Sequence, residues 1–373
     1  MDFNPLQITL ISLLSLALLV QLIYYWGIFV RLAFYKDEQT VSTDLPPVSL
    51  VMAARNEYHH LRKNLPSLLN QDYPDYEVVV VNHASDDETA DYLKEMQQRY
   101  PRLKVVNIER DLNFFHGKKF PLSIGIKSAS NDILLLTDAD CAPVSKQWVK
   151  KMASRYDDST EIVLGVGLYS KEKGFLNRVI RYDTFLVAMQ YLSYALAGMP
   201  YMGVGRNLSY RKNLFFRNKG FISHYDLSSG DDDLFINQTA KAQNTRIEIS
   251  PDSIVYSEPK HHWNDWFIQK RRHLSAGKKY KTRFKILLGG YNLSLGIFYL
   301  TIILLLIKST FILVLLGALS LRLFSRILIQ YKILKRLEDQ QLLLFSLWWE
   351  PVYMLLYTFM GIIGLMSKTV KWK

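Results

Sequence analysis

Two carboxylates separated by one residue, Asp138 and Asp140, end an apolar run and could bind a metal ion. In an extended segment, residues i and i+2 project to the same side, so the pair can bind one hard cation such as Mg²⁺ or Mn²⁺. Such an ion would neutralise the charge of a diphosphate. A solvated turn explains the same pattern, because Asp is common where a strand ends.

A second acidic motif follows Gly230, where Asp231, Asp232 and Asp233 are adjacent. Adjacent like charges raise one another's pKa, which suits a general base. The alternative is a helix N-terminus whose dipole stabilises the acids, because residues 234–240 have a helical pattern. On these residues alone, the helix N-terminus is the favoured interpretation.

A basic segment further along contains Gln269, Arg272 and His273. In a helix these residues, at i, i+3 and i+4, share one face and offer an anion-binding guanidinium beside an amide and an imidazole. The alternative is an exposed basic helix at a membrane surface.

The elements that must position these residues follow an α/β pattern. Apolar runs predict buried strands at 48–54, 77–82 and 132–137, and residues 103–108 are predicted to form another strand. Helical patterns lie between them, including a helix from a capping box of Ser85 and Glu88 to about Tyr100, and a helix over 119–129. The order predicts a doubly wound, mostly parallel sheet that binds its ligands at the carboxyl ends of the strands. Asp138 follows the strand predicted at 132–137, so it lies at a carboxyl end of the sheet, where ligands are expected to bind.

Apolar segments predict membrane spans. Residues 3–30 carry no charge, and roughly 20 apolar residues suffice for a helix to cross a bilayer. Because residue 2 is Asp and no cleavage site follows, this segment is expected to be an uncleaved anchor rather than a signal peptide. Arg31 and Lys36 follow it, so the positive-inside rule places the next part of the chain in the cytoplasm.

The C-terminal part of the chain contains further candidate spans, at 286–307, from about Ser309, and at 342–366. Glu350 and Pro351 lie in the middle of the last one. A carboxylate in lipid is costly and proline kinks a helix, so Glu350 is expected to face protein, water or a headgroup. Two or three C-terminal helices are therefore expected, the last of them crossing or re-entrant.

The predicted organisation has four parts. They are an N-terminal transmembrane anchor (1–35), a cytoplasmic α/β domain (36–260), a basic interfacial helix (261–285) and a C-terminal transmembrane region (286–373).

The chain is basic. Its formal charge is +12, from 46 Lys and Arg against 34 Asp and Glu. Residues 270–285 hold eight basic residues and no acid, which indicates docking to anionic membrane lipids. No nucleic-acid-reading motif accompanies this charge, so no nucleic-acid partner is expected. The single cysteine excludes a disulfide-stapled scaffold.

Taken in order, these motifs resemble the membrane-bound family 2 glycosyltransferases, inverting enzymes with the GT-A fold that include ceramide glucosyltransferases and cellulose, chitin and hyaluronan synthases. The segments that carry the resemblance are 48–57, 117–122, 138–140, 203–211, 230–234 and 269–273. The resemblance implies an integral protein of the plasma (inner) membrane with a cytoplasmic catalytic domain. It also implies a nucleotide diphosphosugar donor, with a UDP-sugar as the expected one.

The resemblance also implies a role for individual residues. The residues expected to contact the nucleotide sugar are Ala54, Asn56, Glu57, Asn82, His83, Lys118, Asp138, Gln269 and Arg272. The acceptor would contact Gly205, Asn207 and His273, and Asp138 with Asp140 would hold Mg²⁺ or Mn²⁺. Asp231 is the expected general base, and Asp232 takes that role if the motif is aligned one residue later.

The sequence departs from the family pattern at three places. Asn82 and His83 stand where a carboxylate normally contacts the base, and Gly230 replaces a glutamate. His273 replaces a tryptophan that stacks on the acceptor sugar in processive relatives, so the expected acceptor is a lipid or lipid-linked glycan. A processive polysaccharide synthase is the alternative enzyme. A catalytically silent membrane scaffold is the alternative of another class.

Overall fold

The computed structural model describes residues 4–36, 45–109, 117–227, 229–307 and 311–366. The chain divides into two compact units. We call Asp37–Lys279 with Ile363–Lys373 the sheet unit, and Met1–Lys36 with Tyr280–Ile362 the helical unit. The division falls within the basic segment predicted over 261–285.

The main sheet of the sheet unit has seven strands in the order β3-β2-β1-β4-β8-β6-β9. Their bounds are β1 Val48–Ala54, β2 Tyr76–His83, β3 Leu103–Ile108, β4 Ile133–Leu136, β6 Ile162–Leu164, β8 Leu208–Arg211 and β9 Thr245–Ile247. Strands β1 to β4 are parallel, which confirms the predicted α/β fold with its mostly parallel sheet. Strand β8 runs antiparallel to both β4 and β6. Its first residue therefore lies beside the last residue of β4.

A smaller sheet in the same unit has the order β5-β10-β7. Its strands are β5 Cys141–Pro143, β7 Gly167–Tyr169 and β10 Val255–Ser257. Because β5 starts directly after Asp140, this sheet lies next to the acidic motif.

Eight α-helices belong to the described residues of the sheet unit. They are α3 Tyr58–Leu69, α4 Thr89–Arg99, α5 Lys119–Ser128, α6 Trp148–Ala153, α7 Phe175–Leu196, α8 Lys212–Arg217, α9 Asp233–Thr239 and α10 Trp263–Ala276. All seven residues of β1 are buried. Helix α5 lies so close to the sheet that a Cβ on Gly125 would be 2.8 Å from Val51 Cγ1. Each Val, Leu or Ile buried in such a core contributes roughly 1.5–3 kcal/mol.

The predicted capping box of α4 is wrong. The N-cap residue is Glu88, and its side chain makes no cap hydrogen bond. The Ser85 hydroxyl instead accepts a hydrogen bond from the Asn56 backbone N–H at 3.0 Å. Asp87 Oδ1 accepts from the Thr89 N–H at 3.1 Å. The loop after β2 is thus bonded to the loop after β1, a long-range partner that competes with the local capping geometry.

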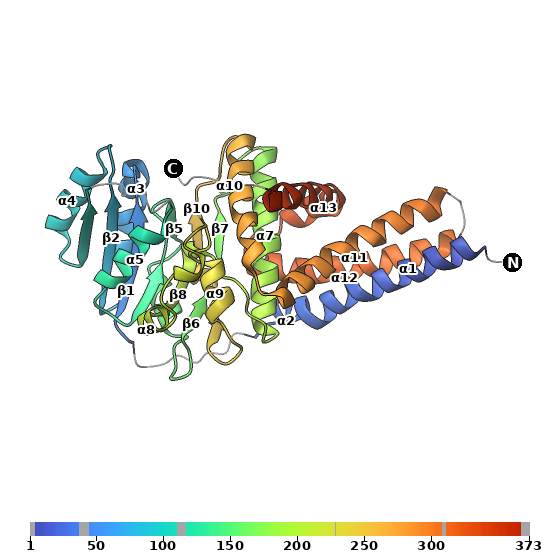
Figure 1. The fold of residues 1–373 in the computed structure, drawn as a ribbon, viewed down its shortest axis with the longest axis horizontal. Coiled ribbons are helices and arrows are strands. Elements are labelled where there is room, and N and C mark those ends of the chain that lie inside the picture. The colour runs from blue at the N-terminus through green and yellow to red at the C-terminus, as the bar shows by residue number, and fades with distance from the viewer. Residues whose placement is uncertain (1–3, 37–44, 110–116, 228, 308–310, 367–373) are drawn as a thin grey trace. The chain divides into compact units, whose positions relative to one another are not determined.

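Within the described residues, the helical unit contains four helices long and apolar enough to cross a membrane. They are α1 Pro5–Ile23, continued by a π-helical segment Tyr24–Phe29 and α2 Val30–Ala33, then α11 Thr282–Ile307, α12 Ile312–Arg336 and α13 Leu342–Met366. Helices α1, α11 and α12 run side by side (Figure 1). Helix α13 is one continuous helix despite Pro351.

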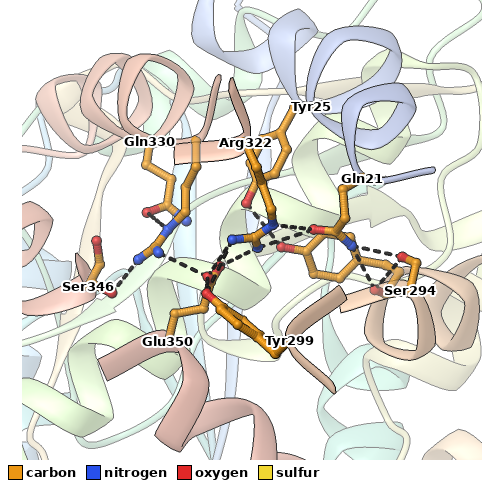
Figure 2. A network of polar contacts seen from close by, with 10 residues as sticks. Gln21, Tyr25, Ser294, Tyr299, Arg322, Gln330, Ser346 and Glu350 are labelled. Carbon is orange, nitrogen blue, oxygen red and sulfur yellow. Dashed lines mark hydrogen bonds and ion pairs between the residues drawn. The ribbon is translucent and has the colours of Figure 1, made fainter. Parts of the chain in front are cut away.

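Glu350 lies at the centre of a polar network between these helices (Figure 2). Its carboxylate pairs with two Arg322 nitrogens at 2.9 and 3.0 Å and with Arg326 Nη1 at 2.9 Å. The Tyr299 hydroxyl donates to it at 2.6 Å, and Arg322 also donates to the Gln21 side chain at 3.2 Å. Glu350 was expected to face protein, water or a headgroup, and the structure shows that it faces protein. These residues come from α1, α11, α12 and α13, so the network links all four helices.

Candidate functional site

The two acidic motifs lie close together although 93 positions separate Asp138 from Asp231. Lys118, at the N-cap of α5, forms an ion pair with Asp138, and its Nζ is 3.7 Å from Asp231 Oδ2. Asp138 follows β4, and the Arg206 carbonyl accepts from the Thr137 hydroxyl at 3.1 Å. The antiparallel strand β8 thus brings loop 203–207 to the end of β4. We call Lys118, Asp138, Asp140, Asp231 and Asp232 the carboxylate site.

Asp138, Asp140 and Cys141 could each offer one ligand atom to a metal ion, with all three atoms within 4.8 Å of one another. The Cys141 thiol donates to Asp140 Oδ1 at 3.2 Å and also contacts the Ser257 hydroxyl at 3.0 Å. Burial and then the neighbouring Asp140 raise the pKa of this thiol, so it stays protonated. The oxygen donors that remain suit Mg²⁺ or Mn²⁺.

Asp138 and Asp140 have different electrostatic surroundings, and their pKa values are shifted in opposite directions. Burial opposes ionisation of Asp138, but the Lys118 ammonium holds its pKa below the usual range. Burial and then the charge of Asp138 raise the pKa of Asp140. A divalent cation would relieve this repulsion, because its charge favours ionised carboxylates.

Asp231 and Asp232 have different partners. Asp232 Oδ2 accepts from the Gly205 N–H at 2.7 Å, and its Oδ1 accepts from the Asp233 N–H at 2.7 Å at the N-cap of α9. Burial and then the Asp231 charge raise the pKa of Asp232 to about 6. Asp231 makes no such backbone contact among the described residues, and its carboxylate faces Lys118. Asp232 thus orders the backbone, whereas Asp231 keeps its oxygens for another partner.

Gly230 departs from the family's glutamate for a local reason. Its φ is +98°, a conformation that favours glycine. A Cβ at this position would also lie 2.5 Å from Leu234 Cδ1. The turn before α9 therefore excludes a side chain here.

The residues expected to contact the nucleotide follow β1 and β2. Asn56 has a φ of +55°, and its Oδ1 accepts from the Asp86 N–H at 2.8 Å. The Glu57 carboxylate contacts His60 Nδ1 at 2.5 Å. Ala54 is the last, buried residue of β1.

Asn82 and His83 end β2 and are buried. Asn82 Nδ2 donates to Asn107 Oδ1 at 3.0 Å, while Asn82 Oδ1 has no hydrogen-bond partner within the part of the chain that the structure describes. The His83 ring lies edge-on to Phe120, with 6.3 Å between centroids. Asn82 therefore offers one acceptor oxygen at the end of the strand.

Gln269, Arg272 and His273 lie on α10, which confirms that this segment is a helix. Gln269 Nε2 donates to the Tyr169 hydroxyl at 3.2 Å. The electrostatic field of Arg272 reaches Asp138, and His273 is exposed. The buried Lys270 pairs with Asp183 of α7 at 2.7 Å, so this ion pair fixes the rotation of α10.

In the loop before β8, Asn207 is fully buried and bonded within the protein. Its Oδ1 accepts from Trp148 Nε1 at 3.0 Å, and its Nδ2 donates to two carbonyls at 2.8 and 2.9 Å. Gly205 uses its N–H to hold Asp232. Arg206, between them, reaches the Tyr169 ring and acts electrostatically on Asp140. Arg206 was not among the site residues expected from the sequence, although its place between two motif residues, Gly205 and Asn207, could have indicated it.

Residues 49–218 match the model of glycosyl transferase family 2. Among curated proteins, the chain is 26% identical over 246 residues to the probable glycosyltransferase YdaM of Bacillus subtilis, covering 61% of this chain and 54% of that one. It is 31% identical to poly-beta-1,6-N-acetyl-D-glucosamine synthase of Staphylococcus epidermidis, over 34% of this chain and 30% of that protein. It is 32% identical to beta-monoglucosyldiacylglycerol synthase of a Nostoc species, over 32% of this chain and 25% of that protein. The matches thus span about half or less of each relative.

Among solved structures, the chain is similar to the mannosyltransferase PcManGT of Pyrobaculum calidifontis, in a complex with GDP-Man and Mn²⁺. The TM-score is 0.59 at 20% identity, covering 89% of this chain and 97% of that chain. This similarity establishes the fold.

Proposed function

We propose that this chain, whose residues 49–218 match the model of glycosyl transferase family 2, is an inverting membrane enzyme that moves a sugar from a nucleotide diphosphosugar to a lipid or lipid-linked acceptor. The observation that supports this most is the bridge that Lys118 makes between Asp138 and Asp231. This bridge brings the candidate metal-binding motif, Asp138 with Asp140, close to the candidate base Asp231. Donor and acceptor would meet between these two carboxylates.

In this proposal each residue of the carboxylate site has one task. Asp138 and Asp140 hold Mg²⁺ or Mn²⁺, which supplies charge neutralisation for the diphosphate. Asp231 takes the proton from the acceptor hydroxyl as that oxygen attacks the anomeric carbon and inverts it. Asp232 holds Gly205 and the start of α9, so Asp231 is better placed as the base.

The remaining proposed contacts surround the leaving group and the base. Arg272 and Gln269 stabilise the diphosphate as its charge develops. The free Asn82 Oδ1 suits an N–H donor of the nucleobase, such as uracil N3–H, which agrees with a UDP-sugar. Ala54, Asn56, Glu57 and His83 would shape the nucleotide site. Gly205, Asn207 and His273 would shape the acceptor side, with Asn207 acting through the loop it supports.

The acceptor proposal is supported by the helical unit and by a relative. In the part of the chain that the structure describes, four apolar helices are long enough to span a membrane, and one relative is named as a synthase of a glucosyl diacylglycerol. Arg31 and Lys36 after the first helix support a cytoplasmic sheet unit at the plasma (inner) membrane. The named poly-N-acetylglucosamine synthase relative makes a processive polysaccharide synthase the second candidate.

Nucleotide binding tests the enzyme proposal against a silent scaffold. Full-length protein in detergent is titrated with UDP and with GDP, each with Mn²⁺ and with EDTA. We expect Mn²⁺-dependent binding that Asp140→Ala abolishes. Asp91→Asn, an exposed carboxylate on α4, is the matched control and should bind as the wild type does. Equal binding by Asp140→Ala would contradict the proposal, and no binding by the wild type would favour the scaffold.

Product size separates the two enzymes. The protein is incubated with labelled nucleotide sugars and a membrane lipid extract, and the products are sized by chromatography. A lipid carrying one added sugar supports the lipid acceptor. A product of many sugar units would establish the polysaccharide synthase instead.

A further inference from the structure

Arg206 is a cation beside the carboxylate site to which the proposed function gives no task. It lies in a short 3₁₀ segment, Gly205–Asn207, at the end of β4. Its neighbours in this segment are occupied, because Gly205 binds Asp232 and Asn207 binds Trp148. Arg206 is thus the side chain through which this loop can contact a ligand.

The guanidinium of Arg206 is held in one orientation by the small sheet. Its Cζ is 4.5 Å from the centroid of the Tyr169 ring, and its Nη1 donates to the Ser257 hydroxyl at 3.4 Å. Tyr169 is itself fixed by the bond from Gln269. A Cβ on Gly167 would lie only 2.4 Å from Arg206 Nε, so the side chain lies flat over this glycine. Such preorganisation lowers the entropy lost when a ligand binds.

The charge of Arg206 has no direct counterion. Among the described residues it makes no ion pair within 4 Å, although its field reaches Asp138 and Asp140. A guanidinium has five N–H donors, and Ser257 takes one of them with a long bond. Its planar donors match a phosphate, and charge-assisted bonds of this kind are about twice as strong as neutral ones.

We propose that Arg206 is a further substrate-binding residue, whose guanidinium binds the β-phosphate of the donor nucleotide next to the metal-binding carboxylates Asp138 and Asp140. The inference rests on the proposed function, because it requires a nucleoside diphosphate at this site. Arg206 would then be a second cation, besides Arg272, that stabilises the diphosphate leaving group. The loop expected to serve the acceptor would then also serve the donor.

The test compares nucleotides with and without a β-phosphate. Full-length protein in detergent is titrated calorimetrically with UDP, UMP, GDP and GMP in the presence of Mn²⁺. We expect Arg206→Gln to weaken the diphosphate of the preferred base by about tenfold, equivalent to about 1.4 kcal/mol. Binding of the matching monophosphate should change less than about twofold, since it lacks the oxygen that Arg206 contacts.

Two further variants separate contact from folding. Gly167→Ala keeps the Arg206 charge but displaces its side chain, and should give the same selective loss for the diphosphate. Arg217→Gln removes an exposed arginine that pairs with Glu161, and should leave both affinities unchanged. Thermal unfolding of each variant identifies one that fails to fold.

Each result decides the inference. A selective loss for the diphosphate in both Arg206→Gln and Gly167→Ala supports it. Unchanged diphosphate binding, or an equal loss for mono- and diphosphate, overturns it while the proposed function stands. If the wild type binds no diphosphate, the proposed function fails and the inference with it.

Discussion

Glu350 in the helical unit and Asp138 in the sheet unit are both carboxylates that ion-pair with basic side chains. Glu350 pairs with Arg322 and Arg326 and also accepts from Tyr299, so one acid meets two cations (Figure 2). All three charged side chains are at most 5% exposed. The negative charge of Glu350 is thus balanced by side chains of the protein itself.

The carboxylate site has the opposite balance. Asp138, Asp140, Asp231 and Asp232 share one ion-paired cation among the described residues, Lys118. Repulsion among these acids raises the pKa of Asp140 and of Asp232, after burial. An acid whose charge is balanced by buried cations joins helices, whereas acids in excess of their cations are available to a metal ion or a proton. Mutations in the first cluster should change stability, and mutations in the second should change activity.

The largest effect is expected from Glu350→Ala. This change leaves Arg322 and Arg326 buried without their counterion, and breaking such a pair costs roughly 3–5 kcal/mol. Thermal unfolding in detergent should show a large fall in Tm. Glu95→Gln, which breaks the exposed Glu95–Arg99 pair, is the control and should change stability by less than about 0.5 kcal/mol. Equal Tm values for the two variants would show that the Glu350 network does not stabilise the fold.

Asp231→Asn should have the opposite result, a loss of activity without a loss of stability. Loss of a general base lowers kcat by roughly 10²–10⁴-fold. Its Tm should hold or rise, because one of two adjacent like charges is removed. The rate of sugar transfer and the melting curve are measured on the same preparation. If Asp231→Asn retains the wild-type rate and Asp232→Asn does not, Asp232 is the base.

A smaller and mixed effect is expected from Lys119→Met. The buried Lys119 Nζ donates to the His224 carbonyl at 2.6 Å and to the Leu227 carbonyl at 2.9 Å, in the segment before Asp231. Leaving these carbonyls unsatisfied costs about 1–3 kcal/mol. Both Tm and kcat should therefore fall, unlike in the previous two variants. Lys127→Met, exposed at the other end of α5, should change neither.

The smallest effect is a pH dependence. Asp232 is ionised above its pKa of about 6 and neutral below it. Protonation removes the charge that holds the Gly205 and Asp233 N–H groups, so kcat should fall as the pH drops through about 6 and then level off at the rate of Asp232→Asn. A pH–rate profile from 5 to 8 measures this. Asp232→Asn should flatten the profile at a lower plateau, and an unchanged acid limb in that variant would assign it to another group.

Much of the fold could be predicted from local pattern. The continuous apolar run 48–54 has the bounds of β1, and the strand predicted over 103–108 has the bounds of β3. The last apolar segment, in which Pro351 was expected to kink or break the helix, is one continuous helix over Leu342–Met366. Burial on both faces and hydrophobic length are properties of a contiguous segment, so the sequence displays them directly. The capping box failed because Ser85 binds Asn56, a partner from another loop.

The site was predictable in its residue types but not in its contacts. Asp138, Asp140 and Asp231 could be found from spacing and from the family resemblance. The division of labour between Asp231 and Asp232 depends on Gly205, which β8 brings close only because it runs antiparallel to β4. Arg206 was missed for the same reason, since its neighbours Tyr169 and Ser257 belong to two other strands.

The sequence by itself determined the α/β pattern, the positions of the apolar segments and the set of ionisable residues. Only the tertiary structure decided which of these charges meet. Gln21 and Arg322 are 301 positions apart and hydrogen-bonded, and Lys118 joins two acids from distant motifs. Local propensity acts over a few residues, whereas electrostatic pairing depends on distances that only the packing of strands and helices sets.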